Sequence, residues 1–397
     1  MEGWKTDKFK NQIQYKSGYT WSKEQELKTQ EPQSARVLTV TNIQKDLDLS
    51  EELYLQDVSE KDKKEKAVSK DWCIAVSSNG NRKRIGNAVF IKDDTDYLFA
   101  SFLTAFKPKE NSDISPEYFF RWLSSHAVQE RITSVSEGTT GLGNLDIRYL
   151  RNMDIHFPEK TEQTAIANIL SKVDEAISSV QSSIVAAERL KKSLMQNLLT
   201  GRMKPDGTLR KDDDFYIDEK FGKVPMGWEV EKFGKRVIVL YGKSQKDVVS
   251  ENGIIPVYGT SGIIEYAAQA LCNHESILVG RKGTIDKPFY IDKPFWAVDT
   301  TYYVDKFIDG NMRYLYYMLL RMNLGNLNEA TGVPSVTRRT LNRQKLIIPP
   351  IDEQNSIVTV IDKIEKQIIK KQSRITVLER LKKSLMQNLL TGKVRLF

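Results

Sequence analysis

The string ERLKKSLMQNLLTG occupies residues 188–201 and returns unchanged at residues 379–392, 191 positions further along the chain. Fourteen consecutive identities indicate an internal duplication, which decides the fold and is therefore the first feature to interpret. The same displacement relates Pro158 to Pro349 and the Glu-Gln pair at 162–163 to the pair at 353–354. The duplicated block therefore extends well upstream of the string.

A second displacement, of 224 residues, relates the starts of the two copies. It matches Gly3-Trp4 to Gly227-Trp228 and Gly18 to Gly242. Because the displacement falls from 224 to 191 along the copies, the second copy is 33 residues shorter than the first. The ends of the two copies match, while the residues between those ends differ in sequence and number. This pattern favours a common frame that presents two different recognition surfaces. Ordinary divergence of a duplicated domain is the alternative.

Each copy ends in a segment with the periodicity of a long amphipathic helix. Apolar residues recur there at spacings of three and four, which is the pattern of a coiled-coil seam. About 40 residues would extend about 60 Å as a helix, and Gly201 and Gly392 stand where a C-terminal glycine cap belongs. An antiparallel pairing within the chain, with pseudo-twofold symmetry, would bring the two stripes together; core helices of two domains are the alternative. The stripes are Ile166, Leu170, Val173, Ile177, Val180, Ile184 and Ala187, and then Ile357, Ile361, Ile364, Ile368, Ile375 and Leu378, with Lys371 interrupting the second.

The duplicated string carries more apolar surface than one seam needs. We therefore expect its leucines to form a duplicated partner-binding surface. These leucines are Leu190, Leu194 and Leu198 in the first copy and Leu381, Leu385 and Leu389 in the second.

The rest of the chain has the pattern of two α+β domains. Short β-like runs occur at 35–43, 72–76, 88–91, 277–279 and 301–304, and short helices are plausible at 116–131 and 311–324. Residues 201–228 hold Gly, Pro and charge without apolar periodicity, so they indicate a linker. We expect four parts, namely 1–157, a helix at 158–202, a linker and second domain at 203–349, and a helix at 350–397.

The composition fits a folded protein with an anionic partner. The 60 Lys and Arg exceed the 52 Asp and Glu, which gives a net charge of +8 and suits nucleic acid; a solvated basic surface is the alternative. Cys73 and Cys272 stand alone, one in each half, so neither a disulfide framework nor a thiolate metal site is expected. We find no secretory signal and no stretch of eighteen apolar residues, so we expect a cytoplasmic protein without a membrane span.

A basic turn lies at comparable places in both domains. SSNGNRKRIGN at 77–87 and GRKGTIDK at 280–287 each place cationic side chains in a Gly-rich turn after an apolar run. Such a turn can project guanidinium groups into a DNA groove, and a solvated turn is the alternative. The candidates for DNA contact here are Asn81, Arg82, Lys83 and Arg84, and Arg281 with Lys282.

Further polar residues are candidates for contacts with bases or phosphates. One group lies near the first β-like run of each domain. Another lies in the loops TTGLGNLDIR and ATGVPSVTRR that precede the long helices, where helix capping is an equal alternative. The candidates are Gln33, Arg36, Thr41, Asn42, Lys243, Ser244, Tyr258, Thr260 and Ser261, and then Asn144, Arg148, Ser335 and Arg338.

These motifs together resemble the specificity subunit of a type I restriction-modification system. The most specific are FPEKTEQ and IPPIDEQ, which open the helices, LLTG, which closes them, and GTSGIIEY with ILVGRKGTIDKPFY in the second domain. The resemblance covers nearly the whole chain. One departure is that the first domain begins at MEGWKTDKF, without the short proximal segment that many relatives carry before the Gly-Trp pair.

The resemblance implies two target-recognition domains separated by two long antiparallel coiled-coil helices. Each domain would read one half of a bipartite double-stranded DNA target, and the helices would fix the spacer. It also implies two modification subunits, which carry S-adenosylmethionine and methylate adenine, and restriction subunits that use ATP and magnesium to translocate and cleave DNA. This chain would hold no cofactor and perform no catalysis itself.

The residues offer little to an enzymatic alternative. His126, His156 and His274 lack metal-ligand spacing, and neither a GxxxxGK[ST] phosphate loop nor an adenine-methyltransferase motif is present. Acidic and lysine residues could be assembled into a nuclease site, but mixed charge runs such as VSEKDKKEK at 58–66 are usually solvated. The other alternative is a coiled-coil scaffold whose domains bind proteins instead of DNA.

Overall fold

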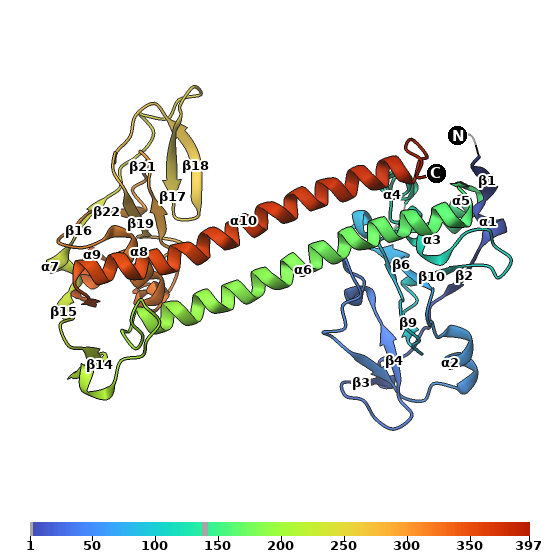
Figure 1. Ribbon diagram of the computed structural model, residues 1–397, viewed down its shortest axis with the longest axis horizontal. Helices are drawn as coiled ribbons and strands as arrows, with labels where there is room; N and C mark the ends of the chain where they lie inside the picture. Colours follow the sequence, from blue (N-terminus) through green and yellow to red (C-terminus); the bar gives the residue numbers. More distant parts are fainter. Residues whose placement is uncertain (1–2, 137–141) are drawn as a thin grey trace. The chain divides into compact units, whose positions relative to one another are not determined.

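The computed structural model describes residues 3–136 and 142–397, and its contacts divide the chain into two compact units (Figure 1). Unit 1 is Met1–Gln181 with Ser373–Phe397, and unit 2 is Ser182–Gln372. Each unit contains a mixed domain and one half of each long helix, α6 (Lys160–Leu198) and α10 (Ile351–Leu389). The predicted duplication is thus present in the fold.

The start and the end of each domain are joined by a short antiparallel ladder. In unit 1, β1 (Lys5–Lys8) pairs with β12 (Asp154–Phe157), and in unit 2, β15 (Glu229–Lys232) pairs with β23 (Lys345–Ile348). The first strand of each ladder is followed by a one-turn helix, α1 (Phe9–Gln12) or α7 (Phe233–Arg236). The second strand lies directly before a long helix, α6 or α10. The shared ends of the two sequence copies therefore build the base of each domain.

Above this base, both domains contain a four-stranded antiparallel sheet with the same strand order. The correspondence shows that 33 fewer residues in the second copy leave the frame unchanged. The sheet of unit 1 runs β2 (Ile13–Ser17), β10 (Leu103–Pro108), β6 (Cys73–Val76) and β8 (Ala88–Phe90), and that of unit 2 runs β16 (Val237–Tyr241), β22 (Thr301–Phe307), β19 (Ser276–Gly280) and β20 (Phe289–Ile291).

The second sheets differ in size, which accounts for part of the length difference. Unit 1 has four strands there and unit 2 has three. They are β3 (Glu26–Leu27), β5 (Leu53–Leu55), β4 (Ala35–Leu38) and β9 (Leu98–Phe99) in unit 1, and β18 (Gly262–Ala267), β17 (Ile255–Gly259) and β21 (Trp296–Ala297) in unit 2.

Short helices pack beside the sheets. The helix predicted at 116–131 is two helices, α3 (Pro116–Leu123) and α4 (His126–Val135), and the one at 311–324 is α8 (Met312–Arg321). Unit 1 also contains α2 (Glu60–Lys66) and α5 (Ile147–Asn152), and α9 (Arg338–Arg343) is the counterpart of α5 in unit 2. Among the described residues, no helix combines the length and the apolar character that a membrane crossing requires.

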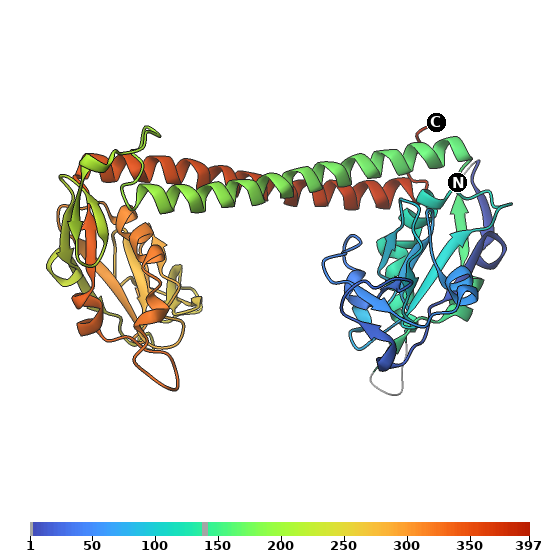
Figure 2. The same ribbon diagram turned by 90° about the horizontal axis from the view of Figure 1, so that it is seen from below.

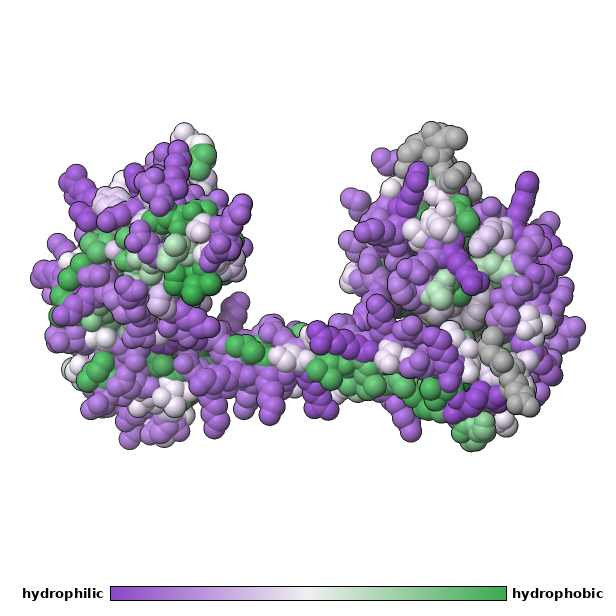
Figure 3. Space-filling model, turned by 90° about the horizontal axis from the view of Figure 1, so that it is seen from above, coloured by the Kyte–Doolittle hydropathy of each residue, from purple (hydrophilic) through white to green (hydrophobic). Residues whose placement is uncertain are grey.

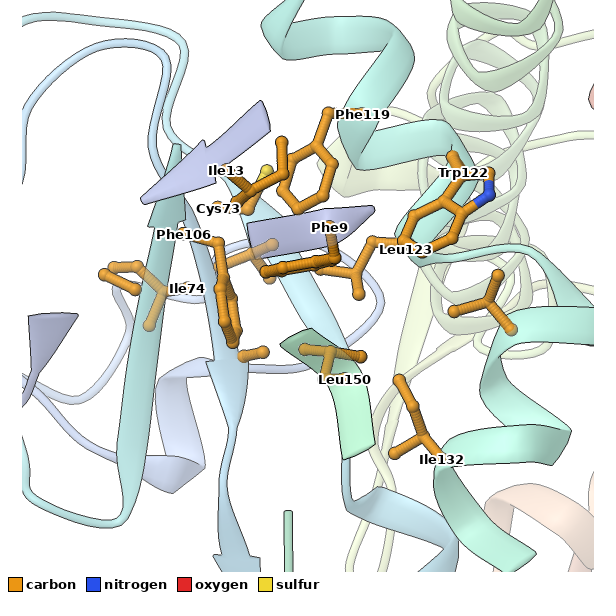
Figure 4. Packing of buried hydrophobic residues seen from close by; sticks show 14 of the residues in the cluster. Phe9, Ile13, Cys73, Ile74, Phe106, Phe119, Trp122, Leu123, Ile132 and Leu150 are labelled. Atoms are coloured by element: carbon orange, nitrogen blue, oxygen red, sulfur yellow. The ribbon is translucent and has the colours of Figure 1, made fainter. Parts of the chain in front are cut away.

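Each unit has its own apolar core. Figure 4 shows Phe9, Phe106 and Phe119 of unit 1 gathered between the sheet and α3. The Phe9 ring meets the other two at centroid distances of 5.7 and 5.8 Å, in edge-to-face geometry that adds to the burial term. Unit 2 places Phe233, which occupies the position of Phe9, in its own core.

The long helices run antiparallel within each unit (Figure 2). In unit 1, Asp174 of α6 binds Lys382 of α10 at 2.6 Å, and Glu162, earlier in α6, binds Arg395, beyond the end of α10. In unit 2, Lys191 binds Glu365 at 2.8 Å, and the Lys371 ammonium donates to the Ser183 hydroxyl. Partners thus progress in opposite directions, and Ser183 satisfies the lysine that interrupts the seam.

The predicted seam is buried most deeply where it meets a domain. Ile166, Leu170 and Ile177 of α6 are buried, and so are Ile357 and Ile361 of α10. Gly201 and Gly392 follow the helices with φ of +68° and +67°, a conformation that glycine adopts without a steric penalty. The predicted helix caps are confirmed.

A glutamine attaches each helix to the neighbouring short helix. Gln163 accepts from the Ser115 N–H at 2.8 Å and donates to the carbonyls of Asp113 and Pro158. Gln354 likewise accepts from the Asn311 N–H at 2.9 Å and donates to the Pro349 carbonyl. Both glutamines have no exposed surface, so the motif read as a helix start is a buried hydrogen-bonded junction.

Charged side chains strengthen this junction in unit 2. Arg313 of α8 binds Glu365 at 2.7 Å and Asp362 at 3.1 Å, and the Tyr317 hydroxyl donates to Glu365. Burial raises the pKa of Glu365, but hydrogen bonds from Lys191 and Tyr317 and the charges of Lys191 and Arg313 outweigh it, so the pKa lies below its ordinary value. Unit 1 uses Arg121, Asp174 and Lys382 at the corresponding place.

The predicted linker is folded. Within 201–228, β13 (Phe215–Asp218) and β14 (Gly222–Pro225) form a hairpin, and Val224 is fully buried in the core of unit 2. Arg210 and the Trp228 indole N–H both bind Glu353 at the start of α10. The segment lacks apolar periodicity because only a few of its side chains face inward, so the predicted linker is instead a folded part of unit 2.

Acidification should weaken the junction of unit 2 through Glu365. A carboxylate whose folded-state pKa is depressed stabilises the fold above its unfolded pKa, about 4.3, and this contribution is lost as the pH falls through the folded pKa. We expect Glu365→Gln to lower the urea midpoint of unit 2 at pH 7, and we expect this difference from wild type to shrink as the pH falls below the unfolded pKa. A difference that stays equal as the pH falls would contradict the assigned role.

Candidate DNA interface

The basic turn of unit 2 is fixed by the backbone around it. The N–H groups of Arg281 and Lys282 both donate to the Thr300 carbonyl, at 2.9 and 3.1 Å. A Cβ on Gly280 would lie 2.1 Å from the Thr284 carbonyl oxygen, so only glycine fits there. The two cationic residues therefore leave the end of β19 on a rigid support.

The loop before α9 pairs with this turn. The Gly283 N–H donates to the Pro334 carbonyl at 2.8 Å, and the Val336 N–H donates to the Arg281 carbonyl at 3.1 Å. An isolated β-bridge joins Lys282 and Ser335. Two sets of candidates that lie 53 residues apart in sequence, at Lys282 and Ser335, thus share one surface.

Tyr241 forms a platform for two arginines of this surface. The guanidinium groups of Arg281 and Arg338 lie 5.4 and 5.0 Å from its ring centroid, and the ring is 44% exposed. Arg281 also donates to the Asp299 carbonyl at 3.0 Å and Arg338 to the Val239 carbonyl at 3.5 Å, so ring contact and backbone acceptors together hold both groups in place. Sequence reasoning missed Tyr241, and its place directly before Gly242 at the end of an apolar run was the available signal.

The tip of the β17–β18 hairpin adjoins the basic turn. A Cβ on Gly283 would lie 3.0 Å from the Thr260 hydroxyl, so the tip and the turn are in contact. Three further candidates are exposed, namely Ser261 at this tip and Lys243 and Ser244 directly after Gly242. Their contacts with DNA stay predictions. Tyr258 instead packs against Phe295 at 6.0 Å, and burial raises its pKa, so it supports the hairpin from inside.

Unit 1 repeats the arrangement with different side chains. The N–H groups of Ser77 and Ser78 both donate to the Phe102 carbonyl, at 2.8 and 3.1 Å. β7 (Ser78–Asn79) pairs with β11 (Gly143–Asn144), so Asn144 takes the place that Ser335 has in unit 2. Thr139–Gly141 of the predicted loop lie outside the described residues. The two domains therefore present the same two segments side by side.

The basic residues of unit 1 have unequal roles. They form a 3-10 turn, Arg82–Arg84, which Asn81 caps by accepting from the Lys83 N–H at 3.1 Å. Arg82 and Lys83 are exposed, whereas Arg84 donates to the carbonyls of Val40 and Ile43 at 3.0 and 2.7 Å. Arg84 thus ties two loops together, and its predicted DNA contact is revised to a structural role.

Other candidates of unit 1 are also bound within the domain. Arg36 binds Glu52 at 3.2 Å and donates to the hydroxyls of Tyr54 and Tyr97, whose hydrogen bonds raise its pKa. Asn42 is buried and donates to the carbonyls of Asp48 and Glu51. These two predictions are corrected, because their polar groups are satisfied inside the fold.

The remaining candidates are exposed. The Thr41 hydroxyl bonds to the Thr39 hydroxyl and its carbonyl accepts from Gln44, and Gln33 is exposed with φ of +68°. Arg148 and Arg338 lie on α5 and α9, not in loops as expected. The caps of α5 and α9 are Asp146 and Thr337, whose side chains accept from backbone N–H groups of those helices. The capping residues are therefore sequence neighbours of the candidates and not the candidates themselves.

The leucines of the duplicated string divide into three pairs. Leu198 and Leu389 are buried in the cores of their units, and Leu194 with Leu385 pack partly against them. Only Leu190 and Leu381, 52% and 46% exposed, are free surface of the kind expected for a partner. The prediction is corrected for the buried pair, because each string packs into the domain of the other copy: Leu198 lies in the core of unit 2 and Leu389 in the core of unit 1.

Two equivalent hollows lie along the duplicated string. The one in unit 2 has a volume of about 540 Å³ and the one in unit 1 about 940 Å³. The same five positions of the string line both, beside the end of α8 or α3. They are Glu188, Lys191, Lys192, Met195 and Gln196 in unit 2 and Glu379, Lys382, Lys383, Met386 and Gln387 in unit 1.

The space-filling view shows hydrophilic side chains over most of the visible face, with apolar residues exposed in separate patches (Figure 3). Within 3–136 and 142–397, no group of three His, Cys, Asp or Glu residues is arranged to hold a metal ion. What the two domains share is a surface of exposed cations and polar side chains, to which unit 2 adds the stacked Tyr241. Such a surface suits the phosphates and base edges of DNA.

Comparisons with known proteins agree with this class of DNA-binding surface. The family model described as the type I restriction modification DNA specificity domain matches residues 1–188 and 237–380. The chain is similar to the type I restriction enzyme MjaIX specificity subunit of Methanocaldococcus jannaschii, with 25% identity over 383 residues that cover 88% of this chain and 85% of the relative. The chain belongs to the type I restriction-modification DNA specificity family.

Solved structures show the same fold. The S subunit of a type I restriction-modification system from M. genitalium matches with a TM-score of 0.62 and 15% identity, covering 97% of this chain and 96% of that one. A structure described for complex assembly and conformational transition of the type I system matches with a TM-score of 0.56 and 14% identity, covering 99% of both chains. The α+β domains with two long antiparallel helices are therefore confirmed.

Arg36 and Arg82 should separate stability from DNA contact. Arg36→Ala removes a partly exposed ion pair and two hydrogen bonds, so we expect a loss of about 1–2 kcal/mol in the unfolding free energy of unit 1. Arg82→Ala should change stability by less than about 0.5 kcal/mol and weaken DNA binding. Urea unfolding and DNA titration at a temperature where both variants are folded test this. Weaker DNA binding by folded Arg36→Ala alone would reverse the assignment.

Proposed function

We propose that this chain is the DNA-specificity subunit of a type I restriction-modification complex, in which each domain binds one half of a bipartite DNA target. The observation that carries the proposal is the repeated surface. Both domains place a turn after the third strand of the main sheet against the segment that precedes α5 or α9. The frame is common while the side chains differ, as two different half-sites require.

The two kinds of polar group on this surface suit different contacts. Arg281 and Arg338 are held on Tyr241, so their guanidinium planes are pre-organised for bidentate contact with guanine or phosphate. Lys282, Ser335 and the exposed residues Arg82 and Asn144 surround the paired segments. We assign these four residues as a group to contacts with base edges and with the DNA backbone.

The long helices fix the distance between the half-sites in this proposal. Two modification subunits dock on the twin hollows, because identical residues of the duplicated string line both. Leu190 and Leu381 are exposed on the same string and extend each docking surface. Two copies of one surface accept two copies of one partner.

Catalysis belongs to the partners. The modification subunits carry S-adenosylmethionine, and restriction subunits supply ATP- and magnesium-dependent translocation and cleavage. This chain directs both activities in the cytoplasm and contributes no cofactor. The alternative of a protein scaffold without sequence specificity is not favoured, because the family match covers both domains.

Adenine methylation across a genome tests the proposal. Cells that express this chain with its modification subunit should methylate one new bipartite motif. The double variant Arg281→Ala/Lys282→Ala should lose discrimination in one half of the motif, since each lost base contact removes about 1–3 kcal/mol of discrimination. Arg82→Ala should affect the other half.

The matched control is Lys345→Ala, which removes a half-buried lysine that binds Asp218 at the base of unit 2, away from the basic turn. It should leave the motif unchanged. A stable complex with an active modification subunit that methylates no bipartite motif would support the scaffold alternative.

A further inference from the structure

Each domain exposes one branched aliphatic side chain at the same place in the candidate interface. Leu142 directly precedes Gly143, the first residue of β11, and Val333 directly precedes Pro334. The two are related by the displacement of 191 that relates the duplicated strings. Leu142 is 42% exposed and Val333 is 64% exposed. Two diverged domains have thus kept an apolar residue on the surface at one position.

The neighbours of both residues are polar and basic. Gly143 pairs with Asn79, and a Cβ on Gly143 would lie 3.0 Å from Cγ of Arg82. Pro334 accepts the hydrogen bond from Gly283, directly after Lys282. Each aliphatic residue therefore flanks a basic turn, so the protein interior does not explain its retention. An apolar group among phosphate-binding cations points to a role on the nucleic acid.

A feature kept in both domains should serve what both half-sites share. The two domains read different sequences, so their base-reading side chains differ, as Arg281 and Lys282 differ from Ser77 and Ser78. If each half-site is methylated on adenine, each contains a target A·T pair. Methylation requires that adenine to leave the base stack, and aliphatic side chains are the type that proteins insert where a stack is opened.

We infer that Leu142 and Val333 are wedges that press into the base stack at the target A·T pair of each half-site and favour the extruded adenine. The inference rests on the proposed function. Neither side chain has a hydrogen-bonding group, so neither distinguishes bases by donor and acceptor pattern. The wedge acts while the partner subunit holds the adenine, and each domain serves only its own half-site.

The test uses the assembled complex of this chain with its modification subunits and duplexes that carry the methylated motif. Hemimethylated duplexes leave one half-site open at a time. We expect Leu142→Ser to lower the single-turnover methylation rate at one half-site by about tenfold and to leave the other unchanged, with the reverse for Val333→Ser. Leu142→Met and Val333→Leu, which keep the bulk, should retain the wild-type rate.

A pre-opened substrate separates a wedge from other roles. With an abasic site or a mismatch opposite the target adenine, extrusion is easier, so the serine variants should regain most of the wild-type rate. Failure of this rescue would overturn the inference, because a lost structural contact is not repaired by the substrate. Deoxyuridine in place of the target thymine should leave the wild-type rate unchanged, and a fall would assign these residues to the thymine methyl group instead.

Ile254→Ser is the matched control, since Ile254 is 82% exposed and precedes β17, at the opposite end of that strand from the hairpin tip. It should keep the wild-type rate on every substrate. A wild-type complex that methylates no bipartite motif would refute the proposed function itself. A wild-type complex that methylates normally, with serine variants that do so equally well, would refute only the wedge.

Discussion

The buried glutamine at the start of each long helix is the constraint on which the rest of the structure depends. Gln163 and Gln354 each accept from the N–H of the residue directly before a short helix and donate to the carbonyl of the proline that follows the preceding strand. A side chain without exposed surface cannot leave such bonds without a cost of about 1–3 kcal/mol per orphaned group. The shared ends of the copies therefore fix how each domain is attached to the start of the long helix that follows it.

This attachment explains how the domains diverged. The ladder before each helix, the glutamine and the charged pairs on α3 or α8 form a base that is independent of the loops above it. Replacing Ser77-Ser78 by Arg281-Lys282 changes what the surface offers to DNA and leaves the backbone hydrogen bonds to Phe102 or Thr300 intact. Sequence choice and assembly are thus carried by different residues of one chain.

The sequence alone predicted the duplication, the two long helices and the glycine caps, because each depends on identity or periodicity within a short stretch. It placed the two basic turns at comparable positions, whereas in the structure Ser77-Ser78 take the place of Arg281-Lys282. It did not predict which polar side chains face inward. In the sequence, Arg36, Asn42 and Arg84 are polar residues in turn-rich segments, as Arg82 is. Their donors are satisfied by groups that only the folded chain brings close to them. Tyr241 was missed for a related reason, since its two arginines are 40 and 97 residues away.

Exchange of one domain at the junction tests the central claim most directly. Residues 1–157 end at β12, immediately before the segment that opens α6, so a relative's first domain can replace them with Gln163 kept. The methylated motif of the chimera should change in one half only, with the other half and the spacer unchanged. A chimera that forms an active complex and changes both halves, or neither, would contradict the separation of recognition from the helical frame.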